Sequence, residues 1–195
     1  MQYELFGVDA LYRGFFALNR YRLRFQRYDG TWSSEIDREI FERGHAVAVL
    51  PYDPVRDQVV MIEQFRPGAL EATGGPWMTE IVAGMIETDE LVEEVAHREM
   101  QEEAGMTTSR LIPITRYWVS PGGTTESIYL FLALIDSSLA TGIHGLAHEQ
   151  EDIRVLTMPL DEALARVDQG TICSAAPIIA LQWLGRHKER FAAPD

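Results

Sequence analysis

Two apolar runs dominate the middle of the chain. HAVAVLPYDP starts at His45 and QVVMIEQF starts at Gln58, and turn-forming Pro and Asp residues separate them. Short apolar runs bounded by turn residues are typical of buried strands. WMTEIVAGMI, SIYLFLALID and EDIRVLTM have the same character. We expect these five segments to form the main sheet, with the WMTEIVAGMI strand ending at Gly84.

Three other segments predict helices. LVEEVAHREMQEEAG contains no Gly or Pro before Gly105, a typical C-terminal stop. DEALARVDQG and residues 174–191 complete the set. This order of strands, one helix, more strands and terminal helices predicts a layered α+β fold.

The N-terminal region has a different pattern. Residues 17–43 alternate between polar and apolar positions, with a turn signal at Asp29-Gly30, which predicts a hairpin or small antiparallel sheet. We therefore expect two domains, a β-rich one over residues 1–44 and a larger one over residues 45–195.

Composition narrows the class of protein. A chain of 195 residues with a 46% hydrophobic fraction is globular, and a net charge of −13 disfavours binding to nucleic acid or anionic membranes. No apolar run approaches the roughly 20 residues that span a bilayer, and the N-terminus lacks the pattern of a signal peptide. Cys173 is the only cysteine, so no intrachain disulfide forms. These features predict a cytoplasmic protein.

Acidic residues are concentrated between residues 84 and 106. Glu99, Glu102 and Glu103 fall within an arc of roughly 100° on a helix. One interpretation is a solvated acidic face. The other is a Mg²⁺ site, because Mg²⁺ takes hard oxygen ligands from carboxylates and substrate phosphates. A turn at Ala83-Gly84 could add a backbone carbonyl, with glycine allowing a close approach.

The same segment resembles the Nudix box at every defined position. In order these are Gly84, Glu90, Arg98, Glu99, an apolar Met100, Glu102, Glu103, Gly105 and an apolar Met106. The resemblance implies a Nudix hydrolase with an α/β/α sandwich and a mixed sheet, which cleaves nucleoside diphosphate derivatives.

The resemblance also implies roles within the box. Glu99 and Glu103 would be the principal ligands of Mg²⁺ or Mn²⁺, with the Ala83 carbonyl as another. Arg98 would hold neighbouring carboxylates by charge-assisted hydrogen bonds. Glu90 and Glu102 would support the site. Bound cations would reconcile an acidic protein with a diphosphate substrate.

Outside the box, the chain is similar to a bacterial branch of the family, the ADP-ribose pyrophosphatases. The segments that show this similarity are LYRGFF, REIFERGHAV, DPVRDQVVMIEQFR, IHGLA, EDIRV, IALQWL and an SPGG sequence whose Pro121 lies sixteen residues after Gly105. By this resemblance Glu149 is a general base on a mobile loop, Glu151 is an additional metal ligand and Arg66 contacts the diphosphate. Without it, Arg66 would be a surface charge and SPGG a tight turn.

The substrate-binding set follows from the same resemblance. Phe15, Arg38 and Glu39 match adenine-binding positions, against the alternatives of core packing for Phe15 and surface ion pairing for the other two. The positions that line the ribose and phosphate site are Met85, Ser120 and Glu126. The branch implies a homodimer in which each adenine site draws on both chains.

Two functional alternatives remain open. The substrate could be another nucleoside diphosphate sugar or a dinucleotide rather than ADP-ribose. A non-enzymatic nucleotide sensor with this fold is disfavoured because every box carboxylate is present. The segment at residues 67–77 receives no predicted role.

Overall fold

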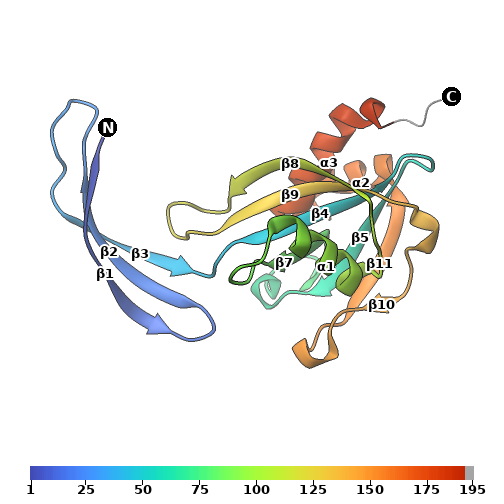
Figure 1. Ribbon diagram of the computed structural model, residues 1–195, viewed down its shortest axis with the longest axis horizontal. Coiled ribbons are helices and arrows are strands. Elements are labelled where there is room, and N and C mark those ends of the chain that lie inside the picture. The colour runs from blue at the N-terminus through green and yellow to red at the C-terminus, as the bar shows by residue number, and fades with distance from the viewer. Residues whose placement is uncertain (192–195) are drawn as a thin grey trace. The chain divides into compact units, whose positions relative to one another are not determined.

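The computed structural model describes residues 1–191, which form two compact units (Figure 1). The N-terminal unit comprises Met1–His45 and Trp118–Ser127. The sandwich unit comprises Ala46–Tyr117 and the chain from Ile128 onward. The sequence predicted the division between residues 44 and 45. By contacts, His45 and the segment at residues 118–127 also belong with the N-terminal strands.

The N-terminal unit is built on a three-stranded antiparallel sheet. Its strands run in the order β1 (Tyr3–Arg13), β2 (Ala17–Phe25) and β3 (Ile36–Glu42). The predicted hairpin over residues 17–43 is confirmed. Its turn places Gly30 at a φ of 85°, and Asp29 accepts hydrogen bonds from Thr31. Strand β1 was not predicted, because adjacent apolar residues such as Leu5-Phe6 break its alternation.

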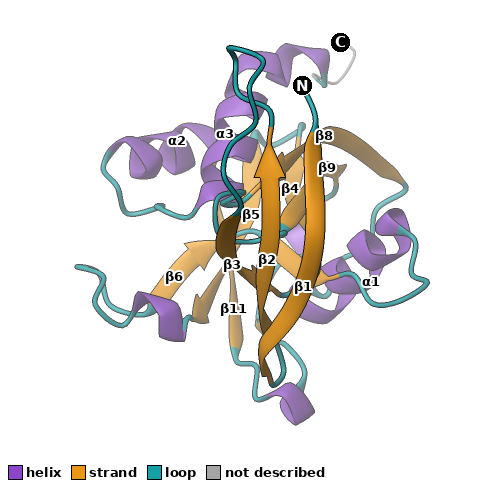
Figure 2. Cartoon of the chain, turned by 90° about the vertical axis from the view of Figure 1, so that its left-hand side faces the viewer, coloured by secondary structure: helices purple, strands orange, loops and turns teal. Residues whose placement is uncertain are grey.

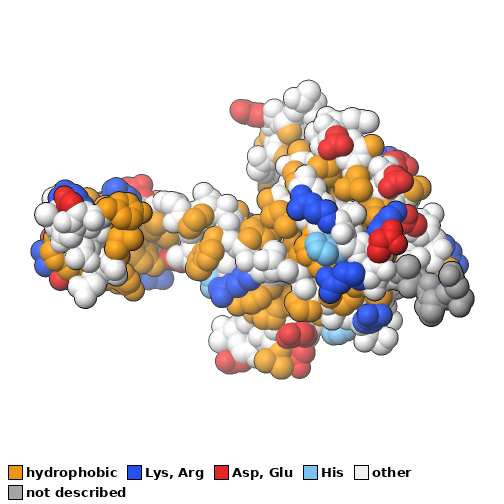
Figure 3. All heavy atoms as spheres, turned by 90° about the horizontal axis from the view of Figure 1, so that it is seen from above, with side chains coloured by type: hydrophobic (Ala, Val, Ile, Leu, Met, Phe, Trp, Pro, Cys, Tyr) orange, Lys and Arg blue, Asp and Glu red, His pale blue; other side chains and the backbone are white. Residues whose placement is uncertain are grey.

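Many large apolar side chains of this unit face solvent. Hydrophobic side chains lie between charged ones on its surface (Figure 3). Within β1 and the turn that follows it, the large apolar side chains that are at least 40% exposed are Tyr3, Leu5, Phe6, Val8, Leu11, Tyr12 and Phe15. A unit this small does not bury its own apolar surface.

The sandwich unit contains a mixed eight-stranded sheet in the order β10-β11-β5-β4-β9-β8, with β6 paired to β5 and β7 to β4. Strand β4 runs parallel to β9 and antiparallel to β5 and β7. The bounds are β4 (Ala46–Asp53), β5 (Gln58–Phe65), β6 (Trp77–Glu80), β7 (Val82–Met85), β8 (Arg110–Trp118), β9 (Ser127–Leu134), β10 (Ile143–His144) and β11 (Ile153–Pro159).

Helices cover both faces of this sheet (Figure 2). One face packs against α2 (Leu160–Asp168) and α3 (Ala175–His187), and the other packs against α1 (Val92–Ala104). Alternation along β4 divides the core, since Ala48 and Leu50 face α2 and α3 whereas Val47 and Val49 face α1. The predicted α/β/α sandwich is confirmed.

The predicted elements differ from the structure in detail. The single strand expected over residues 77–86 is two strands, β6 and β7, which pair with different neighbours on either side of the buried Ile81. The second ends at Met85 rather than Gly84. Residues 174–191 form α3 followed by a short 3₁₀ turn at Lys188–Arg190. Strands β8 and β10 were not predicted.

Candidate active site

Two of the predicted acidic residues are buried on the inner face of α1. Glu99 is 9% exposed and Glu103 is 2% exposed, and they share that face with Met100. Glu93 and Glu94, in the first turn of the same helix, are exposed. The solvated-face interpretation therefore fails for Glu99 and Glu103.

Burying these carboxylates is unfavourable in the folded chain by itself. Burial raises the pKa of Glu99 to about 7, although the adjacent Arg98 guanidinium acts in the opposite direction. Burial also holds the pKa of Glu103 well above its usual range, and the charges of Glu99 and Glu151 add to this effect. Buried ionised groups normally require a charged partner or a metal. The inner face of α1 thus holds negative charge that a cation would stabilise.

Arg98 joins the other box carboxylates to this pair. Its Nη1 donates to Glu99 Oε1 at 2.7 Å and to Glu102 Oε2 at 3.0 Å, while Nε and Nη2 each contact Glu90 at 3.2 Å. Nη2 also donates to the Met85 carbonyl at 3.4 Å. Burial would lower the pKa of Arg98, but these carboxylates raise it. The predicted contacts between Arg98 and the neighbouring carboxylates are present.

The backbone of β7 lies directly against the two buried glutamates. A Cβ at Gly84 would overlap the Glu99 carboxylate, so only glycine fits there. The Ala83 amide donates to Glu103 Oε2 at 2.8 Å. The N–H and C=O of one residue in an antiparallel strand point to the same side. The Ala83 carbonyl therefore also faces away from β4, on the side of Glu103.

The C-terminal end of α1 keeps these residues in register. Gly105 adopts a φ of 64°, and its amide donates to the Gln101 carbonyl at 3.1 Å. The Met106 amide donates to the Met100 carbonyl at 3.0 Å, and the bond from Gly105 to Gln101 is that of the αL C-cap motif. The helix thus ends at Ala104, two residues after Glu102, and the carbonyls of Met100 and Gln101 keep hydrogen-bond partners.

Arg66 follows β5 and supplies positive charge near the buried pair. Its Nε donates to Glu80 Oε2 on β6 at 2.6 Å, and its charge acts to lower the pKa of Glu103. The Arg66 amide donates to the Pro76 carbonyl at 2.7 Å, which closes the loop over residues 67–75. A guanidinium held beside a candidate metal site is well placed to form hydrogen bonds to a metal-bound diphosphate.

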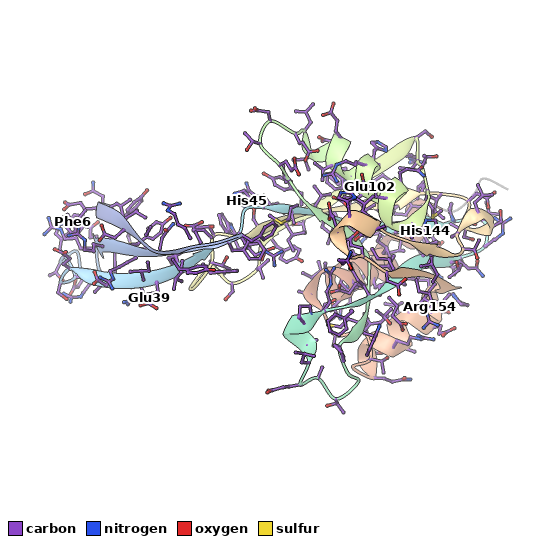
Figure 4. The ribbon with its side chains drawn as sticks, turned by 90° about the horizontal axis from the view of Figure 1, so that it is seen from below. Phe6, Glu39, His45, Glu102, His144 and Arg154 are labelled. Atoms are coloured by element: carbon purple, nitrogen blue, oxygen red, sulfur yellow. The ribbon has the colours of Figure 1, made fainter. Side chains whose placement is uncertain are left out.

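The loop between β10 and β11 brings a third carboxylate toward α1. Glu151 accepts from Gln64 Nε2 at 3.4 Å and from the Leu146 amide at 3.3 Å. The Gly145 amide donates to the Glu102 carbonyl at 3.0 Å and ties the loop to α1. Figure 4 labels Glu102 on α1 and His144 on the strand that leads into this loop.

Glu149 has a different setting from Glu151. It ends a short 3₁₀ turn (Ala147–Glu149), and its side chain is 55% exposed. Its carboxylate lies 3.6 Å from His148 Nε2. The structure thus brings Glu151 to the α1 cluster and leaves Glu149 at the solvent-exposed tip of the loop.

The predicted adenine-binding residues all belong to the N-terminal unit. Phe15 is 88% exposed and meets Phe16 edge to face at 4.7 Å, so it is not a core residue of this chain. Arg38 and Glu39 lie exposed on β3, where Arg38 donates to the Asp37 carbonyl at 2.7 Å (Glu39 is labelled in Figure 4). Within the described residues neither forms an ion pair, which leaves both available to a ligand.

Ser120 and Glu126 belong to the N-terminal unit as well. The Ser120 carbonyl accepts from the amides of Gly123 and Thr124, both at 2.9 Å, so the SPGG sequence is a tight turn. Glu126 is only 7% exposed, and Arg43 Nε lies 3.4 Å from its carboxylate. Glu126 therefore has a charged partner within its own unit, in addition to any role toward substrate.

Sequence reasoning missed two polar residues of this site. Gln64 contacts Glu151, and Glu80 pairs with Arg66. The available signal was their position, since each is a polar residue at or near the end of a strand-forming apolar run.

The arrangement fits a divalent cation. Glu99, Glu103, Glu151 and the Ala83 carbonyl are hard oxygen donors of the kind that Mg²⁺ and Mn²⁺ take. Within residues 1–191, no three His, Cys, Asp or Glu side chains already meet as a finished cation site. The carboxylates would have to converge on the ion.

Comparisons with known proteins agree with this geometry. The NUDIX domain family matches residues 42–175, a range that contains the whole acidic segment. This chain belongs to the Nudix family. The Nudix box thus coincides with α1, its Gly105 cap and the β7 backbone beside it.

Several relatives are similar over nearly the whole chain. The ADP-ribose pyrophosphatase of Escherichia coli (strain K12) is 50% identical over 95% of this chain and 89% of its own length. The ADP-ribose pyrophosphatase of Haemophilus influenzae is 42% identical over 93% of this chain and 85% of its own. The GDP-mannose pyrophosphatase of Cronobacter sakazakii is 36% identical over 93% and 94%.

A solved structure shares the fold. An ADP compounds hydrolase covers 99% of this chain and 98% of its own, with a TM-score of 0.74 at 18% identity. Among the described residues, no helix is both long and apolar enough to cross a membrane.

Proposed function

We propose that this chain hydrolyses the diphosphate of ADP-ribose to AMP and ribose 5-phosphate. The observation that carries the proposal is the burial of Glu99 and Glu103 against the β7 backbone at Gly84, because two carboxylates buried together suit a divalent cation better than a structural core. The ADP-ribose pyrophosphatases at 50% and 42% identity support the substrate.

Nudix chemistry of this kind depends on a divalent cation, and we propose Mg²⁺, with Mn²⁺ as its substitute. Glu99, Glu103, Glu151 and the Ala83 carbonyl would hold it, while Arg98 keeps Glu90, Glu99 and Glu102 oriented. When bound, the cation would neutralise the diphosphate oxygens in the transition state. Arg66, held by Glu80, would contact the same diphosphate.

Glu149 would act as general base and take the proton of the attacking water. Its exposed position at the loop tip suits a residue that reaches the substrate only when the loop moves. Gly142 and Gly145 have φ values of 100° and 99° and flank β10, so the loop has glycines at its candidate hinges.

The adenine would be bound by Phe15, Arg38 and Glu39, with the exposed phenyl ring and the guanidinium stacking on the base. Met85, Ser120 and Glu126 would line the ribose and phosphate positions. We propose a homodimer in which the apolar N-terminal strands are covered by the second copy, so that both chains contribute to each adenine site. The cytoplasmic location stays a prediction.

A panel of ADP-ribose, ADP-glucose, GDP-mannose, NADH and diadenosine phosphates tests the proposal. We expect ADP-ribose to have the highest kcat/KM, to give equimolar AMP and ribose 5-phosphate, and to be inert in chelator. GDP-mannose is the main competitor, because a GDP-mannose pyrophosphatase is 36% identical. A higher kcat/KM for GDP-mannose would overturn the substrate, and no turnover of any of them would favour a nucleotide sensor.

A further inference from the structure

Gln64 is a buried polar residue on the α1 face of the sheet. Val60 and Ile62, which precede it at alternate positions on β5, pack in the α1 core, so the alternation places Gln64 on that face too. Gln64 is only 7% exposed. An apolar residue would continue the series, and an amide there needs another explanation.

The amide makes one contact that bears on the site. Its Nε2 donates to Glu151 Oε1 at 3.4 Å. Its Oε1 is buried and accepts no hydrogen bond from any described residue. Buried polar groups of native proteins are almost always satisfied, so an unsatisfied acceptor beside a loop carboxylate indicates a site and not simple packing.

The chemistry of an amide suits this position. Glu99, Glu103 and Glu151 carry the same charge, and the charge of Glu151 acts on both of the other two. A carboxylate at position 64 would add to this repulsion, and an apolar side chain would leave one oxygen of Glu151 without a donor. An amide N–H attracts the carboxylate without changing the charge of the cluster.

We propose that Gln64 is a positioning residue that holds Glu151 beside the α1 glutamates, so that the loop carboxylate reaches the same cation. This inference rests on the proposed function, so its test must distinguish a failure of the positioning role from a failure of the proposed metal site. Strand β5 is largely buried and pairs with β4, β6 and β11, whereas Glu151 lies on the loop between β10 and β11. The amide therefore fixes the loop carboxylate relative to the sheet.

Mn²⁺ binding to the full-length protein without substrate, followed by electron paramagnetic resonance, tests the inference. Gln64→Met keeps the length of the side chain and removes the amide, and we expect about a 10-fold weaker Mn²⁺ affinity, as for other partners of metal ligands. The double variant Gln64→Met/Glu151→Gln should bind no more weakly than Glu151→Gln alone. If Gln64→Met does not fold, Gln64→Asn, whose amide is one methylene shorter, should show the same direction of loss.

Gln58→Met provides the matched control. Gln58 lies on the same strand but accepts from Ser137 Oγ at 3.0 Å, so the same chemical change there should leave Mn²⁺ affinity unaltered. A second readout needs no metal. Amide hydrogen exchange at Leu146, whose N–H is bonded to Glu151, should be faster in Gln64→Met than in Gln58→Met.

The outcomes separate the two proposals. Suppose Glu99→Gln and Glu151→Gln weaken Mn²⁺ binding while Gln64→Met and Gln64→Asn bind it as the wild type does. The positioning role is then wrong and the proposed metal site stands. If Glu99→Gln also binds Mn²⁺ normally, the metal site itself is wrong. Additive losses in the double variant would also overturn the positioning role.

Discussion

At residue 84 the chain has no room for a side chain, because the Glu99 carboxylate occupies the position of a Cβ. Gly84→Ala should push Glu99 out of place and lower kcat/KM by about 100-fold, the scale expected when a reacting geometry shifts by about 1 Å. Gly74→Ala is the control, since nothing lies within 4 Å of its Cβ position. Equal activity of the two variants would mean that the contact between Gly84 and Glu99 is unimportant.

Glu149 and Glu151 lie two residues apart and should have separable roles. Glu149→Gln should lose about 10²- to 10⁴-fold in kcat with little change in metal requirement, because it removes a general base and no ligand. The loss should shrink at high pH, where hydroxide replaces the activated water. Glu151→Gln should instead raise the Mg²⁺ concentration needed for activity. Measuring kcat against pH and Mg²⁺ checks both, and an unchanged kcat for Glu149→Gln would assign the base to another residue.

At the scale of the element, the carboxylates buried on the inner face of α1 lower the stability of the metal-free protein. The pKa of Glu103 is raised in the folded protein, so its charged form destabilises the fold at neutral pH when no cation is bound. Glu103→Gln should therefore raise the Tm of the metal-free protein, by roughly 2–4 °C for each kcal/mol of relief. At the same concentration, Mg²⁺ should raise the Tm of the wild type more than that of the variant, which has lost one ligand. Calorimetry in chelator and in Mg²⁺ checks this, and a lower metal-free Tm for Glu103→Gln would show that the charge is already compensated.

Some of these elements could be predicted from the sequence alone and others could not. α1 was predictable because it lacks Gly and Pro until Gly105. The resemblance to the box implied that Arg98 contacts neighbouring carboxylates, and the structure identifies them as Glu90, Glu99 and Glu102. The break between β6 and β7 was not predictable, because each strand is defined by the neighbour with which it pairs. The role of Gln64 could not be predicted either, because its contact with Glu151 joins residues that are 87 positions apart in the sequence.

At the scale of the whole molecule, the exposed apolar strands predict assembly. A charge at Leu5, which is 49% exposed on β1, should weaken a dimer that buries this strand. We expect light scattering to report twice the 22.1 kDa chain mass for the wild type, and Leu5→Asp to become monomeric and less active. Val55→Asp is the control, because Val55 is 76% exposed in the sandwich unit. A wild-type monomer with full activity at micromolar concentration would contradict the dimer.

The most direct test of the account is the rate of AMP formation from ADP-ribose as a function of Mg²⁺ concentration, for the wild type and Glu103→Gln. The account predicts no turnover of the wild type in chelator, a saturable rise with Mg²⁺, and ribose 5-phosphate in equal amount to AMP. Glu103→Gln should need far more Mg²⁺ and remain severely slower at saturation, because it loses an anionic ligand. Wild-type turnover that persists in chelator, or a variant curve that overlays the wild type, would contradict it.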